Sequence, residues 1–167
     1  QDVARTAGVS KGIIHYYFLN KDELMMSVLD QVSGGIESGL AARIQSQDDA
    51  IKKLEIFIEL CFNVVRTTRA WYQVSMDFWT QINQKNEVRS TIANHYSKFR
   101  ETASRIIEEG IRTKVFRTVD PKSHASYIIA VIDGLSLQWL FDESAYEIEK
   151  IAKMSSEVII NGLRPAR

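Results

Sequence analysis

The residues whose types suggest chemistry stand close together near the start of the chain, at Lys11, His15, Tyr16 and Tyr17. Their ammonium, imidazole and hydroxyl groups can hydrogen-bond to base edges and to phosphate oxygens, which is how a helix reads DNA in the major groove. Gly8 precedes them, and glycine allows the positive φ that a tight turn between two short helices requires. This pattern predicts a helix-turn-helix, although a helical hairpin with a buried tyrosine pair would also fit it.

Local signals around this segment predict where its helices lie. Ala4 is small enough to let two helices cross closely, and Ser10 can cap the second helix. Asn20 and Glu23 have a spacing that resembles a capping box, which predicts the start of a third helix. The first two helices are expected to bury a set of apolar side chains, Val3, Ala7, Val9, Ile14 and Phe18.

The rest of the chain also has helical periodicity. Apolar residues recur at spacings of three and four, and no segment alternates like a strand for long. Asp120-Pro121 marks one helix start, and Ser144 with Glu147 marks another. Further helices are expected over 49–68, 70–81, 86–112, 120–141 and 144–162. The sequence therefore predicts an all-α fold.

Three glycines weaken the helix that is expected to begin near Asn20. Gly34, Gly35 and Gly39 all fall in its second half, and glycine is a poor helix former. We therefore expect a bend or a close helix contact there, and a pivot at this stretch is conceivable.

The composition is that of an ordinary globular chain. Its 167 residues are 45% hydrophobic and 25% charged, and 21 basic residues balance 21 acidic ones. Zero net charge argues against a protein that coats nucleic acid without sequence preference, because such binding depends on neutralised phosphates. The chain has one cysteine, no signal peptide and no apolar run near the roughly 20 residues of a membrane helix. We therefore expect a cytoplasmic protein with no membrane partner.

No metal, cofactor or catalytic cluster is expected. His15, His95 and His124 are scattered, and none has a second ligand at a metal-binding spacing. Cys61 lies on an apolar stripe without a paired histidine. No glycine-rich phosphate loop or nucleophile motif is visible. The sequence therefore predicts that the protein is not an enzyme.

Residues 2–30 closely resemble the DNA-binding signature of the TetR family of transcriptional regulators. The motifs that carry the resemblance are Val3-Ala4, Gly8-Val9-Ser10-Lys11-Gly12, Tyr16-Tyr17-Phe18 and Asn20-Lys21-Asp22-Glu23-Leu24. The later motifs Asp133-Gly134-Leu135 and Gln138-Trp139-Leu140 are similar to the family's usual dimerisation helix. The resemblance implies a helix-turn-helix domain over 1–30, with its first helix missing before Gln1, and a helical ligand-binding and dimerisation domain over 31–167.

The family pattern also implies which side chains contact DNA. They occupy the second helix, its cap and the start of the third helix: Ser10, Lys11, Gly12, Ile13, His15, Tyr16, Tyr17 and Lys21. The first residues of the second helix would face base edges, whereas Tyr17 and Lys21 would contact phosphates. Partial packing of Tyr17 on the following helix stays open as an alternative.

In this family a small molecule binds in the helical body and releases the DNA. Aromatic side chains with a few polar groups suit such a pocket. The candidate ligand residues are Phe57, Cys61, Trp71, Phe78, Trp79, Tyr96, Phe99 and Trp139. Each of them would also fit a plain hydrophobic core. Clustered tryptophan and tyrosine would suit a quaternary ammonium effector through cation–π contact.

The last two long helices carry apolar residues on more than one face, which exceeds what one core-facing stripe needs. The candidate dimer residues are Ile128, Ile132, Leu135, Trp139, Ile151, Val158 and Ile159. This pattern predicts a homodimer that pairs these helices in a four-helix bundle. The predicted protein is a ligand-responsive regulator, a repressor that binds a palindromic double-stranded DNA operator as a dimer and is released by a small-molecule effector. The alternative is a helical ligand or protein sensor without DNA binding.

Overall fold

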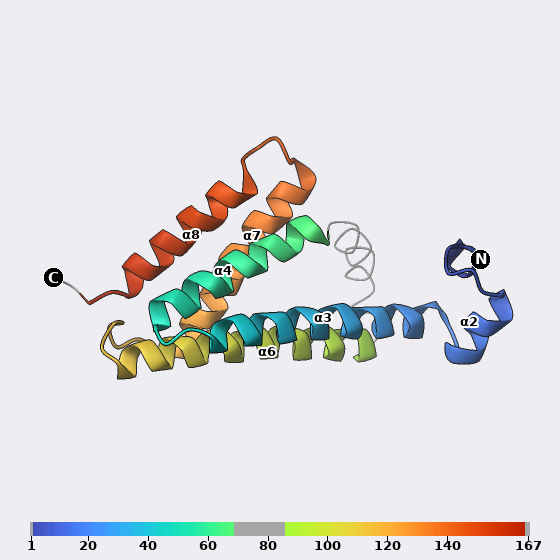
Figure 1. The fold of residues 1–167 in the computed structure, drawn as a ribbon, viewed down its shortest axis with the longest axis horizontal. Helices are drawn as coiled ribbons and strands as arrows, with labels where there is room; N and C mark the ends of the chain where they lie inside the picture. Colours follow the sequence, from blue (N-terminus) through green and yellow to red (C-terminus); the bar gives the residue numbers. More distant parts are fainter. Residues whose placement is uncertain (1, 69–85, 166–167) are drawn as a thin grey trace. The chain divides into compact units, whose positions relative to one another are not determined.

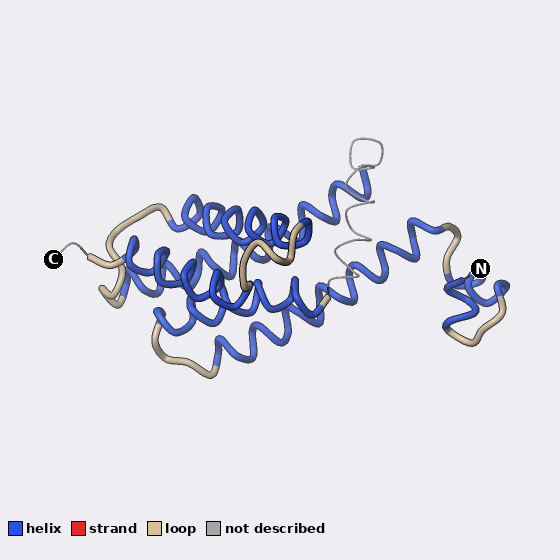
Figure 2. The backbone as a smooth tube through the Cα atoms, turned by 90° about the horizontal axis from the view of Figure 1, so that it is seen from above, coloured by secondary structure: helices blue, strands red, loops and turns tan. Residues whose placement is uncertain are grey.

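The computed structural model describes residues 2–68 and 86–165, and the regular elements in these ranges are all helices (Figures 1 and 2). In chain order they are α1 (Asp2–Thr6), α2 (Lys11–Tyr17), α3 (Lys21–Gln45), α4 (Ala50–Thr67), α6 (Asn86–Arg112), α7 (Pro121–Phe141) and α8 (Ile148–Leu163). The predicted all-α fold is therefore confirmed. The helix expected over 70–81 lies outside the described residues.

The chain divides into two compact units, Gln1–Glu37 and Ser38–Arg167. The first unit contains α1, α2 and most of α3, and the second contains the end of α3 and all later helices. The boundary expected between residues 30 and 31 separates a DNA-binding domain from a ligand-binding domain, and this division by function stays a prediction.

Two of the predicted helix starts carry side-chain caps. At the start of α4, the Asp49 carboxylate accepts a hydrogen bond of 2.9 Å from the backbone N–H of Ile51. At the start of α7, the Asp120 carboxylate accepts one of 3.0 Å from the backbone N–H of Ser123, and Pro121 occupies the first turn. These side chains satisfy amide groups that have no partner inside the helix.

The predicted start of the last helix at Ser144 is wrong. The Ser144 hydroxyl donates a hydrogen bond of 2.6 Å to the Asp142 carboxylate, just beyond the end of α7. Glu147 is the N-cap residue of α8 and makes no side-chain capping bond. Ser144 does not cap α8 because its hydroxyl is taken up by the turn that leaves α7.

The glycines of α3 do not break the helix, and the bend expected there stays a prediction. α3 is one continuous helix from Lys21 to Gln45 that includes Gly34, Gly35 and Gly39. A Cβ built on any of these glycines would meet nothing within 4 Å among the described residues, so a close helix contact is not seen either. Glycine lowers the stability of a helix by about 1 kcal/mol relative to alanine, which is too little to end a long helix by itself.

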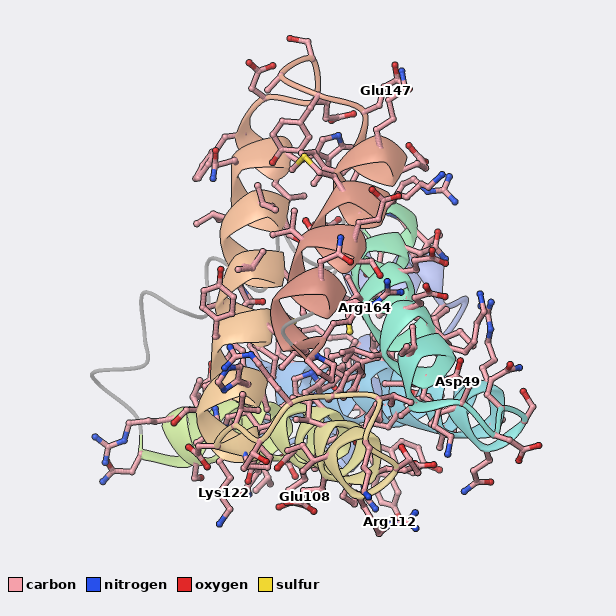
Figure 3. The ribbon with its side chains drawn as sticks, turned by 90° about the vertical axis from the view of Figure 1, so that its left-hand side faces the viewer. Asp49, Glu108, Arg112, Lys122, Glu147 and Arg164 are labelled. Carbon is pink, nitrogen blue, oxygen red and sulfur yellow. The ribbon has the colours of Figure 1, made fainter. Side chains whose placement is uncertain are left out.

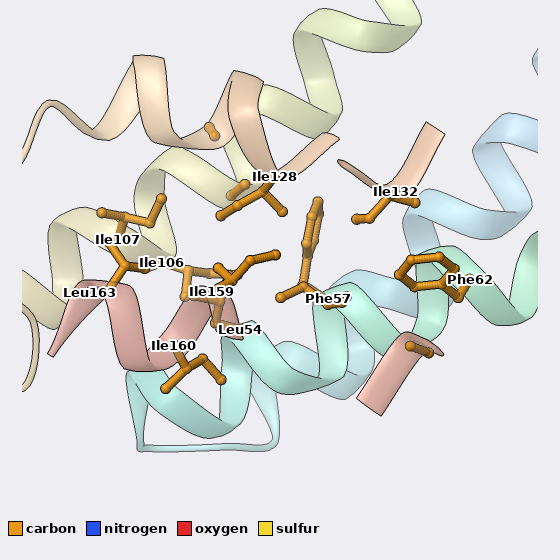
Figure 4. Packing of buried hydrophobic residues seen from close by; sticks show 14 of the residues in the cluster. Leu54, Phe57, Phe62, Ile106, Ile107, Ile128, Ile132, Ile159, Ile160 and Leu163 are labelled. Carbon is orange, nitrogen blue, oxygen red and sulfur yellow. The ribbon is translucent and has the colours of Figure 1, made fainter. Parts of the chain in front are cut away.

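The core of the second unit lies where α4, α6, α7 and α8 meet. α4 contacts the other three helices, and α7 contacts α6 and α8. α4 faces this core with an apolar stripe at three- and four-residue spacing. Figure 4 shows side chains from all four helices pointing into one cluster. Its labelled residues are Leu54, Phe57, Phe62, Ile106, Ile107, Ile128, Ile132, Ile159, Ile160 and Leu163.

The connection from α6 to α7 is hydrogen-bonded to the end of α8. The backbone N–H of Arg117 donates to the Leu163 carbonyl, and its Nε donates to the Gly162 carbonyl, both at 2.8 Å. The buried Phe116 ring packs on Gly110. These contacts fix the turn between the two helices.

Charged side chains cover the outside of the second unit. In Figure 3, Glu108, Arg112 and Lys122 point away from the helices, and all three are exposed. One ion pair is more sheltered: Lys53 of α4 donates to the Glu109 carboxylate of α6 at 2.7 Å. In the described part of the chain, no helix is both long enough and apolar enough to cross a membrane.

Candidate nucleic-acid interface and effector site

α2 is a seven-residue helix that presents aromatic side chains to solvent. Its N-cap, Ser10, accepts a hydrogen bond of 3.3 Å from the backbone N–H of Ile13, as predicted. Tyr16 is 83% exposed and Tyr17 is 69% exposed, and their rings meet edge to face with centroids 5.2 Å apart. The alternative of a buried tyrosine pair is therefore wrong.

The turn before α2 has the geometry that its sequence predicts. Gly8 has a φ of +65°, which side-chain-bearing residues adopt only at a cost. The Val9 N–H donates to the Ala4 carbonyl at 3.0 Å, and Ala4 is buried. The expectation that Val3 and Ala7 are buried is wrong, because α1 is a five-residue helix with Ala4 as its one buried residue.

α3 begins with a hydrogen-bonded turn next to α2. The Asn20 side chain accepts a bond of 2.9 Å from the Glu23 N–H, and the Glu23 carboxylate accepts one of 2.6 Å from the Leu19 N–H. In a capping box the second bond comes from the N-cap residue itself, so the Asn20 pattern is a variant shifted by one residue. This turn fixes Lys21 as the first residue of α3, with its side chain exposed.

The expected DNA contacts therefore form one exposed group on α2, on its cap and at the start of α3. All eight are exposed: Ser10, Lys11, Gly12, Ile13, His15, Tyr16, Tyr17 and Lys21. α2 contains no acidic residue, so no carboxylate on this helix would repel a phosphate. Leu19 is 86% exposed beside this group, and the sequence pattern did not indicate this exposure. The group combines hydrogen-bond donors, aromatic edges and positive charge, as base and phosphate contacts require.

The expected ligand residues are brought together in part. The rings of Phe57 on α4 and Phe99 on α6 lie with their centroids 6.3 Å apart and their planes tilted by 59°. His95, one turn before Phe99, packs edge to face on its ring at 4.8 Å. Cys61 and Tyr96 lie on these same two helices, and both are half-buried. Trp71, Phe78 and Trp79 lie outside the described residues.

Trp139 is buried in the core and also borders a separate pocket. This open pocket of about 490 Å³ lies at the connection between α7 and α8, and Arg66 from α4 forms part of its wall. Arg66 forms an ion pair with Glu149 at 3.4 Å in this wall. Of the other expected ligand residues, those that the structure describes, Phe57, Cys61, Tyr96 and Phe99, do not line it.

Asp133 is a functional candidate that the sequence reasoning missed. It is half-buried on α7 and accepts a hydrogen bond from the Tyr96 hydroxyl. Burial raises the pKa of the Asp133 carboxyl, and the bond from Tyr96 acts in the opposite direction. The signal was visible in the sequence, because Asp133 is the one charged residue between Ala125 and Phe141.

Cys61 belongs to the same neighbourhood. Burial raises the pKa of its thiol to about 12, and the negative charge of Asp133 adds to the effect. The thiol therefore stays protonated at neutral pH, which fits the expectation of an unreactive side chain. Within residues 2–68 and 86–165 no three His, Cys, Asp or Glu side chains gather as metal ligands would.

The expected dimer residues divide between core and surface. Ile128, Ile132 and Ile159 are buried in the core of the second unit, as is Trp139. Leu135 and Ile151 are partly buried. Val158 is 60% exposed, and it shares the outside of α7 and α8 with Tyr127, Phe141 and Met154.

Comparison with known proteins identifies the family. Residues 50–160 match the family described as BetI-type transcriptional repressor, C-terminal, and residues 1–28 match bacterial regulatory proteins of the tetR family. The first match covers more than half of the chain. The protein therefore belongs to the TetR family of transcriptional regulators, and the predicted regulator of the repressor type is confirmed as its class.

Individual relatives are distant in sequence and span nearly the whole chain. A fatty acid metabolism regulator protein from Bacillus subtilis is 22% identical over 96% of this chain and 82% of its own length. The HTH-type transcriptional regulator BetI from Proteus mirabilis is 25% identical over 94% of this chain and 77% of its own length.

Solved structures share the fold. A regulator from Saccharomonospora viridis in complex with choline has a TM-score of 0.89 at 23% identity, covering 99% of this chain and 86% of that one. FadR from Bacillus subtilis in complex with stearoyl-CoA has a TM-score of 0.81 at 21% identity, covering 97% and 87%. These similarities confirm a helix-turn-helix followed by a helical body.

Proposed function

We propose that this protein is a ligand-responsive repressor that binds a palindromic operator as a homodimer and leaves it when a small molecule binds the second unit. The observation that carries the proposal is the exposed face of α2, which is free of acidic residues and rich in hydrogen-bond donors. A soluble protein has little reason to expose two adjacent tyrosines unless they contact a partner.

On DNA, the start of α2 would enter the major groove with Lys11, Gly12 and Ile13 near base edges. Gly12 has no side chain, so the backbone can approach the bases closely. Tyr17 and Lys21 would hold phosphates on either side of the groove. Lys21 begins a long helix, where the backbone amides and the helix dipole also favour an anion.

The dimer would form through the outer faces of α7 and α8. Tyr127, Gly134 and Phe141 are seven residues apart, so they follow one line along α7, and all three are exposed. Met154 and Val158 add exposed apolar area on α8. Two such helices from each copy would make a four-helix bundle. A dimer has two α2 helices, as an operator with half-sites one DNA turn apart, about 34–36 Å, requires.

Two of the similar solved structures are complexes with ligands of different chemical classes. Choline carries a quaternary ammonium group, whereas stearoyl-CoA has a long acyl chain and a negatively charged carrier. We propose that this chain also responds to a small molecule through the half-buried residues between α4 and α6, and that it acts as a switch without a catalytic role.

A DNA-binding assay tests the proposal. Fluorescence anisotropy with duplexes from the region upstream of the gene should show saturable binding by the wild-type protein at low salt. Tyr16→Ala and Lys21→Ala should each weaken binding by about five- to 100-fold, as the loss of one base or phosphate contact does. Lys21→Ala should also reduce the slope of the logarithm of the binding constant against the logarithm of the salt concentration by about 1, because one phosphate contact is lost.

Lys122→Ala is the matched control, because Lys122 is an exposed lysine at the start of a helix in the second unit. Its affinity for DNA should equal that of the wild-type protein. A wild-type protein that binds ligand but none of the duplexes would support the alternative, a helical sensor without DNA binding.

A further inference from the structure

Leu19 is the most exposed large apolar side chain in the part of the chain that the structure describes. It is 86% exposed, and it belongs to the turn between α2 and α3. A leucine gains free energy when its side chain leaves water, so this position has apolar surface that a partner can cover.

Leu19 is one of a group of exposed apolar side chains. Ile13, Tyr16 and Tyr17 are 45%, 83% and 69% exposed, so four such side chains fall within seven residues. A single exposed apolar residue needs no explanation, whereas a group of them marks a contact surface. Lys21 follows directly after this group and is also exposed. The surface therefore combines apolar area with positive charge.

Hydrogen bonds fix the backbone of the turn on both sides of Leu19. The Phe18 N–H donates to the Ile14 carbonyl at 2.9 Å, which ties the turn to α2. The Leu19 N–H donates to the Glu23 carboxylate at 2.6 Å, which ties the turn to α3. The Asn20 side chain accepts a third bond of 2.9 Å from the Glu23 N–H. The side chain of Leu19 is therefore held in a defined place before any partner binds, which lowers the entropy cost of a contact.

The conformation of Phe18 sets the direction in which Leu19 points. Phe18 has extended backbone, with φ of −134° and ψ of 119°, and side chains alternate between two sides along extended backbone. Phe18 is half-buried, whereas Tyr17 and Leu19 are exposed. Leu19 therefore points outward as Tyr17 does, two residues before Lys21 begins α3.

A DNA backbone offers an apolar surface beside each phosphate. Every phosphate is joined to a deoxyribose, and contacts to phosphate and sugar together fix the register of a protein on DNA. We propose that Leu19 packs on the deoxyribose next to the phosphate that Lys21 holds, and that Glu23 is the positioning residue for this contact. The inference rests on the proposed function, because it adds a residue to the DNA interface of the first unit.

A contact of this kind differs from the other contacts of the interface in two measurable ways. It carries no charge, so it releases no counterion and leaves the salt dependence of binding unchanged. It touches no base edge, so it contributes equally to binding of every sequence. Lys21 lacks the first property, because it neutralises a phosphate.

Fluorescence anisotropy with the full chain tests both properties. The duplexes are one from the region upstream of the gene and a scrambled one of equal length and composition. Leu19→Ala should weaken binding to both duplexes by the same factor, about three- to tenfold, because part of a leucine side chain stays in water. The slope of the logarithm of the binding constant against the logarithm of the salt concentration should equal that of the wild-type protein.

Leu19→Lys tests whether the side chain reaches the DNA backbone. An ammonium group at this position should contact a phosphate, so the slope should become steeper by about 1. Gln31→Lys is the matched control, because Gln31 is exposed on the same helix as Lys21 and lies ten residues further on, about 15 Å along α3. Its slope should equal that of the wild-type protein.

A double-mutant cycle tests the role of Glu23. Glu23→Ala removes the acceptor of the Leu19 N–H, so Leu19→Ala should weaken binding less in that background than in the wild-type protein. Glu23→Gln keeps an acceptor oxygen and should restore most of the effect of Leu19. Circular dichroism should show an unchanged melting temperature for Leu19→Ala, because its side chain is exposed in the absence of DNA.

Four results would overturn the proposal. They are wild-type affinity of Leu19→Ala, a loss confined to the upstream duplex, an unchanged slope for Leu19→Lys, and additive effects in the cycle. If Tyr16→Ala and Lys21→Ala weaken binding in the same assay, these results leave the proposed repressor function intact. A wild-type protein that binds neither duplex would instead overturn the proposed function, and the contact of Leu19 with it.

Discussion

Gly110 is a position in the second unit where only glycine fits. It is buried near the end of α6, and a Cβ built on it would lie 2.0 Å from Cδ2 of the Phe116 ring. Because Phe116 is itself buried, the ring has no free space into which it can move. Gly110→Ala should therefore destabilise the protein by about 1–3 kcal/mol, as overpacking does, and chemical denaturation measures this.

Gly39→Ala is the matched control for Gly110→Ala. Gly39 is exposed in α3, and a Cβ there would meet nothing within 4 Å among the described residues. Alanine should stabilise the helix by about 0.5–1 kcal/mol. Equal effects of the two substitutions would show that the Phe116 ring does not occupy the space beside Gly110.

The charge on Asp133 should make stability depend on pH in a defined direction. Its pKa is raised in the folded protein, so the folded state binds a proton more tightly than the unfolded state. The destabilising effect of the ionised carboxylate is complete above the folded pKa and disappears as the pH falls toward the unfolded value. Asp133→Asn should therefore melt above the wild-type protein at pH 7.5, and this difference should shrink as the pH falls to about 4.

Asp120→Ala should show the opposite sign on the same helix. The capping bonds to Ser123 lower the pKa of the Asp120 carboxyl, so its ionised form stabilises the folded state. Asp120→Ala should melt below the wild-type protein at pH 7.5, and this deficit should shrink as the pH falls. Parallel pH profiles for the two variants would contradict the opposite pKa shifts.

At the scale of single residues, the sequence predicted the exposed face of α2, and it predicted the residues of the effector site only in part. Gly8, Ser10 and the tyrosines act within a few residues of one another, so their roles are local. Asp133, Tyr96 and Cys61 come from three separate helices. Whether these three side chains lie close together depends on how the helices pack, and residue types alone do not predict that packing.

α3 is the element that belongs to both units, and its three glycines are a second feature to test. The helix is continuous, so replacing Gly34 and Gly35 together by alanine should stabilise it by about 1–2 kcal/mol in all. We expect the double variant to bind DNA and to respond less to effector, if deformation of α3 transmits the signal. DNA-binding assays with and without effector measure this, and an unchanged response would rule out the deformation.

Helix starts were predictable wherever a side chain caps its own helix. Ser10 and Asn20 were identified for this reason. Ser144 failed because a competing acceptor, Asp142, lies two residues before it and takes its hydroxyl. The glycines of α3 do not end their helix, since weak propensities do not end a helix whose backbone bonds continue on both sides.

The proposed dimer gives a prediction for the whole molecule. Met154 and Val158 are 51% and 60% exposed on α8, one turn apart. Replacing both by glutamate should raise the dimer dissociation constant at least about 100-fold, because like charges would face each other across the two-fold axis. Analytical ultracentrifugation measures the constant.

Thr118→Glu is the control, because it adds a carboxylate at an exposed position of the connection between α6 and α7. It should leave the dimer unchanged. A wild-type protein that remains a monomer at micromolar concentration would contradict the predicted homodimer.

The sequence by itself determined the helices, the turn at Gly8 and the exposed α2 face, because these depend on side chains that act on their own backbone or a neighbouring turn. Only the tertiary structure decided which apolar faces of α7 and α8 are core. Ile128, Ile132 and Ile159 are buried against α4 and α6, whereas Tyr127, Phe141 and Val158 stay outside. Both sets have helical periodicity, and that pattern does not say which face meets another helix. The same reason hid the surroundings of Asp133, which are set by packing between helices.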